Sequence, residues 1–178
     1  MAFDLGGLLQ KYLGGIAPSA TEAQAHFDEV AQNASPSILS QGLSAMFHSD
    51  QTPPFSQSAS QMFSQANPNQ KAGMLNQLIA GMGPDVLASL LSGAGGAAIA
   101  SVLGKSASTA ESPITPEQAA QLTPEQVQQM ANHAQQNNPS IVDHMSDFYA
   151  QHSGLIKTLG GAALAIALAK IANNNKDA

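Results

Sequence analysis

The residue types that most often carry chemistry gather at 143–152. Asp143 and Asp147 are four residues apart, so on a helix they share one face, and His144 lies beside them. Carboxylates and imidazoles so arranged can bind a divalent metal, but the pair of His at i and i+4 that is typical of zinc sites is missing. His152 falls past the expected end of the helix. We therefore interpret the group as a solvated polar face and expect neither a metal nor a cofactor.

Other catalytic patterns are also missing from the sequence. The glycine-rich run at 93–96 has no Lys-Ser or Lys-Thr after it and no strand before it, so it does not match a phosphate-binding loop. No serine has the flanking glycines of a nucleophile elbow. The chain has no cysteine, which removes thiol chemistry and cysteine-ligated zinc. We therefore expect a protein that is not an enzyme and keep a metal-dependent enzyme as the least favoured alternative.

Composition narrows the partners that such a chain can bind. The formal net charge is −6, and the six basic residues are all lysines scattered along the chain. Without arginine there is no bidentate contact to phosphate or guanine, and without a basic patch there is no electrostatic footprint for nucleic acid. Charged residues make up 10% of the chain, against about 25% in ordinary domains, so copies repel one another weakly. We expect contacts with protein and none with nucleic acid.

The elements that must position these residues are helices. Proline or a capping box stands at the expected start of most of them, and the apolar residues that follow recur at helical spacing. Capping boxes are expected at Ser19, Thr115 and Thr123, and Ser35 is the expected N-cap before Pro36. The expected helices cover about 5–13, 21–33, 36–47, 56–65, 68–80, 124–136, 139–151 and 155–172, and the stretch 85–103 is expected to form one helix or a pair of helices. The sequence thus predicts an all-α fold, a helical bundle of repeated Pro-capped helix hairpins. Composition further suggests a helical region at 1–105, a linker at 106–114 and a second helical region at 115–178.

Part of the sequence is repeated. Residues 30–39 match residues 133–142 without a gap, including a shared Pro-Ser-Ile, and residues 65–69 are a weaker third copy. A Gly-Gly-Ala-Ala-Ile/Leu-Ala hexapeptide follows the copy at 65–69 and the copy at 133–142. The two hexapeptides are at 95–100 and 160–165. Biased composition could produce such matches by chance. The ungapped match favours duplication of a helix-turn-helix unit that ends in an Ala/Gly-rich helix.

The two Ala/Gly-rich helices are the candidate interaction elements. Small residues four apart share one helix face and allow two helix backbones to approach closely. The candidate residues for a helix–helix or oligomer interface are Gly96, Ala100, Gly104, Gly161, Ala165 and Ala169. Close packing inside a bundle, an oligomer interface and conditional membrane insertion all remain open. Insertion is not favoured, because the uncharged stretch between Lys157 and Lys170 spans only about 18 Å of helix.

Several motifs of the chain form a familiar combination. They are the Phe-Asp-Leu at 3–5, Gly-Gly pairs between helices, low-charge Gln/Ala/Leu helices and the runs at 122–129, 148–152 and 159–165. In these features the chain resembles the YidB-like family of bacterial proteins. It implies a helical bacterial protein without known catalytic residues and assigns no site.

These observations lead to one functional hypothesis and an alternative from another class. We expect a non-enzymatic, self-assembling or adaptor protein that acts through protein–protein contacts, with itself or another protein as partner. The alternative is a membrane-active protein whose apolar helices insert conditionally. A cytoplasmic location is expected, because the N-terminal residues lack a basic segment and carry Asp4, unlike a secretory signal.

Overall fold

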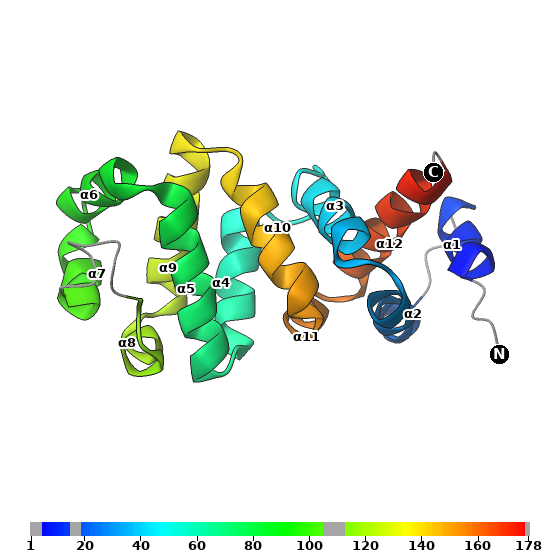
Figure 1. Ribbon diagram of the computed structural model, residues 1–178, viewed down its shortest axis with the longest axis horizontal. Coiled ribbons are helices and arrows are strands. Elements are labelled where there is room, and N and C mark those ends of the chain that lie inside the picture. The colour runs from blue at the N-terminus through cyan, green and yellow to red at the C-terminus, as the bar shows by residue number, and fades with distance from the viewer. Residues whose placement is uncertain (1–4, 15–18, 105–112, 177–178) are drawn as a thin grey trace. The chain divides into compact units, whose positions relative to one another are not determined.

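The computed structural model describes residues 5–14, 19–104 and 113–176 (Figure 1). Within these ranges the chain forms twelve α-helices and no strand, which confirms the all-α class. In chain order they are α1 (Leu5–Leu13), α2 (Ala20–Asn33), α3 (Pro36–Phe47), α4 (Phe55–Gln65), α5 (Pro68–Met82), α6 (Pro84–Ser92), α7 (Gly96–Leu103), α8 (Pro116–Gln121), α9 (Pro124–Asn137), α10 (Ile141–Gln151), α11 (Ser153–Ile156) and α12 (Gly161–Lys176). A 3-10 turn, η2 (Lys157–Leu159), lies between α11 and α12.

Local sequence explains most of the helix starts. Four helices begin with a reciprocal capping box, which involves the N-cap residue and the residue three positions later. The N-cap side chain accepts a hydrogen bond from the backbone N–H of that later residue, whose side chain accepts one from the backbone N–H of the N-cap. These N-caps are Ser19, Asn67, Thr115 and Thr123. The sequence predicted three of the boxes, and Asn67 adds the fourth. Ser35 is the N-cap of α3 as predicted, but its hydroxyl makes no capping bond and lies 3.0 Å from the hydroxyl of Ser37.

The first compact unit consists of residues 1–54 and 146–178. Its centre is α12, which packs against α1, α2 and α3. Phe27, Leu43 and Leu168 are fully buried there. A Cβ added to Gly42 on α3 would collide with the side chain of Ile171 on α12, so glycine sets the spacing of these two helices.

The second compact unit is residues 55–145. In it α4 and α5 both pack against α9, while α6 packs against α7 and α5 against α8. Its core is rich in Phe and Met, including the fully buried Phe55, Phe63 and Met62. The side chain of Asn76 on α5 accepts from the Ile114 N–H at 2.7 Å and donates to the Ile114 carbonyl at 3.2 Å, which fixes the chain just before α8.

The units are not divided where composition placed the domain boundary. The expected linker was 106–114, of which residues 106–112 lie outside the described residues. The compact units instead meet along the chain at 54/55 and 145/146, so the first unit is discontinuous. The physical reason is the packing of α12 against helices more than a hundred residues earlier, a contact that local composition does not reveal.

Two expected helical stretches are interrupted by glycine. The stretch 85–103 forms the pair of helices that was one of the two alternatives, α6 and α7, which are separated at Gly93–Gly95, where Gly95 has φ +84°. The stretch 155–172 divides at Gly160, which has φ +87°, so the expected single last helix is wrong. Residues with a Cβ rarely adopt these φ values, which explains why glycine stands at both breaks.

The repeated segments have compatible structures. Residues 30–39 cover the end of α2 and the start of α3, and residues 133–142 cover the end of α9 and the start of α10. Both first helices have 14 residues. The starts differ, because α3 begins at its proline whereas α10 begins two residues after Pro139. Duplication therefore stays a prediction.

Candidate interaction surface

The acidic and histidine residues near α10 do not converge on one point. Asp143 and His144 are exposed, while the Asp147 carboxylate accepts a short hydrogen bond from the Ser40 hydroxyl on α3. The described residues contain no group of three or more His, Cys, Asp or Glu side chains that could hold a metal ion. Asp147 thus links two helices of the first unit.

The other histidines lie in separate, mostly apolar surroundings. His152 stacks on Phe148 with ring centroids 4.2 Å apart, and its Nδ1 lies 2.9 Å from the Phe148 carbonyl oxygen. The Nε2 atom of His133 is buried without a hydrogen-bond partner among the described residues. Among the described residues, neither ring belongs to a group of three or more histidine and acidic side chains that could hold a metal ion. These positions favour structural roles over proton transfer.

The closest approach to a catalytic arrangement is the pair Tyr12 and His26. The Tyr12 hydroxyl lies 2.7 Å from Nδ1 of His26, and the rings meet edge to face. Burial, with a smaller effect from the Glu22 carboxylate, raises the pKa of Tyr12 to about 12. A raised pKa keeps the phenol protonated and poorly nucleophilic at neutral pH, opposite to what catalysis by tyrosinate needs. The pair therefore attaches α1 to α2. Sequence analysis missed it, because the two residues lie on different helices.

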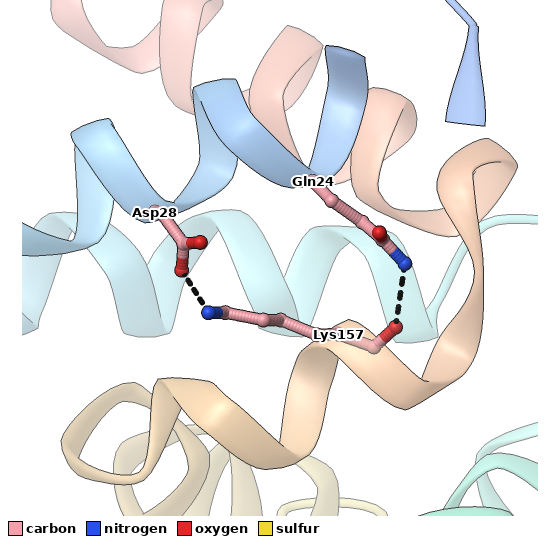
Figure 2. A network of polar contacts seen from close by, with 3 residues as sticks. All are labelled: Gln24, Asp28 and Lys157. Atoms are coloured by element: carbon pink, nitrogen blue, oxygen red, sulfur yellow. Dashed lines mark hydrogen bonds and ion pairs between the residues drawn. The ribbon is translucent and has the colours of Figure 1, made fainter. Parts of the chain in front are cut away.

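A second polar network joins α2 to the turn before α12. The Lys157 ammonium forms an ion pair with the Asp28 carboxylate at 2.5 Å, and the Gln24 side chain donates to the Lys157 carbonyl at 3.4 Å (Figure 2). Both charged side chains are more than a third exposed, so solvent screens the pair and its contribution is small. The network positions η2 beside α2.

The glycine and alanine residues of α12 are engaged within the first unit. Gly161 is buried, and a Cβ added there would collide with the backbone of Ala20 at the start of α2. Ala165 and Ala169 are half-buried on the same helix. At Gly161, therefore, close packing is satisfied inside the chain.

The residues singled out on α7 are only partly on the helix. Gly96 is buried, and a Cβ there would collide with the carbonyls of Leu90 and Leu91 in the preceding helix. Ala100 is half-buried, while Gly104 is exposed and lies beyond the helix end with φ +53°. The close approach at Gly96 thus makes the sharp turn between α6 and α7.

The opposite faces of α6 and α7 are exposed, and the one charged residue on these two helices is Asp85, in the exposed first turn of α6. No charged residue occurs from 86 to 104. Within that stretch the exposed positions on each helix follow helical spacing and are all alanine or serine. We define the hairpin surface as Ala88, Ser89 and Ser92 of α6 with Ala97, Ala98 and Ser101 of α7. Val86, Leu91 and Val102 are half-buried beside them. The sequence singled out the face of α7 that carries Gly96, and the structure turns that face toward α6 and leaves the opposite face exposed.

No described helix combines the length and the apolar character needed to cross a bilayer. No protein-family model, curated protein or solved structure that we compared with the chain matches it. What the structure shows is an all-α chain, over the residues that it describes, with two compact units, one of them discontinuous.

Proposed function

We propose that this chain is a non-enzymatic protein that acts through protein–protein contacts, first of all with further copies of itself. The hairpin surface is the observation that carries the proposal. It combines exposed alanines with half-buried Val86, Leu91 and Val102, without a charge for 19 residues. Exposed apolar surface grouped in this way is typical of contact sites. The resemblance to bacterial YidB-like proteins supports a bacterial, cytoplasmic setting, which stays part of the proposal.

Charge favours a second copy as the partner. The chain carries a net charge of −6 but few charged residues, so two copies repel one another only weakly and mainly where those residues lie. A two-fold symmetric contact places a patch against the same patch, so any charge at its centre meets its own equivalent. A patch of alanine and serine avoids that repulsion, and its small side chains permit close helix packing.

The size of the surface sets the expected strength. α6 has nine residues and α7 has eight, so the hairpin is about 13 Å long. Two helices of about 10 Å width give at most about 300 Å² per copy, against about 800 Å² in a stable interface. Association through this surface alone is therefore weak and reversible.

Sedimentation velocity and light scattering between about 1 µM and about 1 mM test the proposal. We expect the mass to rise above 18.2 kDa with concentration. Ala98→Glu should abolish the rise in mass, because a two-fold symmetric contact would bring the new carboxylates of both copies into the same interface, where they repel each other. Ala25→Glu, an equally exposed alanine on α2, is the matched control and should leave the rise unchanged.

A constant mass of 18.2 kDa over this range would overturn self-association. Equal effects of the two variants would show that association depends on net charge and not on the hairpin surface.

A further inference from the structure

The first compact unit is assembled from two separate stretches of chain. We call residues 5–47 the N-segment, which contains α1, α2 and α3, and residues 146–176 the C-segment, which contains α12. The contacts that hold the unit together join one segment to the other. They include the Asp28–Lys157 ion pair and the fit of Gly42 against Ile171.

The N-segment is joined to the rest of the chain by a short connection. Only residues 48–54 separate α3 from α4. The Thr52 hydroxyl donates to the Met46 carbonyl at 2.6 Å and lies 3.0 Å from the Ser49 carbonyl, so the first part of the connection is tied back to α3. Pro53 and Pro54 follow and are exposed. Proline fixes φ, so little of this connection can adjust.

The C-segment begins within a helix that starts in the second unit. α10 runs as one helix from Ile141 to Gln151, across the boundary between Met145 and Ser146. The second unit therefore carries the start of the C-segment on a continuous helix. Residues 48–54 are the connection through which the N-segment is joined to the rest of the chain. Short connections of this kind favour exchange of segments between copies, because a short connection restricts how a chain can close on itself.

We propose that two copies of this chain exchange segments, so that the C-segment of each packs against the N-segment of the other. Every contact between the segments is then made between copies, with the same residues and geometry. The proposal rests on the self-association proposed above and deepens it. The hairpin surface gives a weak encounter, and exchange supplies the larger buried interface that the hairpin surface lacks.

Crosslinking between two differently labelled full-length chains tests the exchange. The side chains of Gln41 on α3 and Asn174 on α12 lie 3.5 Å apart and are exposed. The chain has no cysteine, so Gln41→Cys in one chain and Asn174→Cys in another introduce one thiol each. The two chains are mixed, unfolded in guanidinium, refolded together at high concentration and treated with a short bismaleimide. Mass spectrometry then counts the 41–174 linked peptides.

The matched control pairs Asn174→Cys with Gln57→Cys, an exposed position on α4 in the second unit. We expect the 41–174 product to exceed the control product about tenfold, because exchange multiplies the effective concentration of the paired thiols. Inserting four Gly/Ser residues after Pro54 should lower the yield several-fold, since a longer connection lets each chain close on itself. An unchanged yield would overturn the role of the connection.

A 41–174 yield no higher than the control would overturn the exchange. If the mass still rises with concentration in that case, self-association through the hairpin surface stands by itself. If the crosslink forms and the mass of the Ala98→Glu variant still rises with concentration as it does without the substitution, exchange stands. The hairpin surface is then not the site of the first encounter.

Discussion

Replacing Tyr149 with phenylalanine should stabilise the first unit. Tyr149 on α10 is fully buried, and its hydroxyl has no hydrogen-bond partner among the described residues. Its ring lies 5.9 Å from that of Phe47 and 5.7 Å from that of Phe148. Phenylalanine keeps the ring and these contacts and removes only the hydroxyl.

The size of the effect follows from desolvation. Burying a hydroxyl without a partner costs about 1–3 kcal/mol in proteins. Relaxation of the surrounding side chains reduces the gain, so Tyr149→Phe should raise the free energy of unfolding by about 1–2 kcal/mol. The free energy of unfolding of small proteins falls by about 2 kcal/mol per molar urea, so the urea concentration at the midpoint of unfolding should rise by about 0.5–1 M.

Tyr12→Phe is the matched control, because the chain has only two tyrosines. The Tyr12 hydroxyl has a partner, Nδ1 of His26 at 2.7 Å. Removing it should lower the free energy of unfolding by about 0.5–1.5 kcal/mol. The same substitution should therefore change stability in opposite directions at the two positions. Urea unfolding followed by circular dichroism measures both, and destabilisation by Tyr149→Phe would refute the reasoning, since it would mean that the hydroxyl is satisfied when folded.

Three further results follow from individual residues. The pKa of Tyr12 is raised from about 10 to about 12, so its contribution to stability is present below pH 10 and is lost as the pH rises through 12. The tyrosinate absorbance of the folded chain should therefore stay low at pH 10. Half-ionisation of the tyrosines at pH 10 would contradict this prediction. Gly42→Ala should destabilise the folded chain by about 1–3 kcal/mol, because the added Cβ collides with α12. Gly154→Ala, which has open space around it, should stabilise the folded chain by about 0.4–1 kcal/mol. Thermal melts compare the two variants, and equal shifts in melting temperature would contradict the collision. Thr123→Ala should lower the free energy of unfolding by about 1 kcal/mol, because the Thr123 hydroxyl caps α9. Ser35→Ala removes no capping bond and should lower it by about a third of that or less. Similar losses of stability in urea titrations of the two variants would contradict the cap geometry.

Helix starts were predictable because their causes are local. A capping box needs only residues three apart, and proline at the first helical position tolerates its missing N–H in any fold. Thr115 and Thr123 therefore form the predicted caps. The break at Gly160 was missed, because leucine, isoleucine and lysine precede it and an alanine-rich run follows it, and these residues are compatible with one continuous helix. The positive φ of Gly160 separates η2 from α12.

The candidate surface was only partly predictable. The sequence identified α7 and α12 by their small residues, but spacing alone does not tell which partner a small residue faces. Gly161 meets Ala20, and Gly96 meets the carbonyls of α6, so both contacts are internal. The exposed alanines emerged only once the turn at Gly95 was known. Pairings between distant segments, such as α3 with α12, have no local signature at all.

The discontinuous first unit also has a consequence for biosynthesis. As the chain leaves the ribosome, α2 and α3, with the apolar side chains of Phe27 and Leu43, emerge more than a hundred residues before α12, the helix that packs against both of them. At about 5–20 residues per second, these side chains wait on the order of 10 s for α12. The second unit, whose chain is continuous, can fold during that interval. On a crowded polysome the first α12 to arrive can belong to a neighbouring nascent chain, so the ratio of exchanged to closed molecules should depend on translation rate and ribosome spacing.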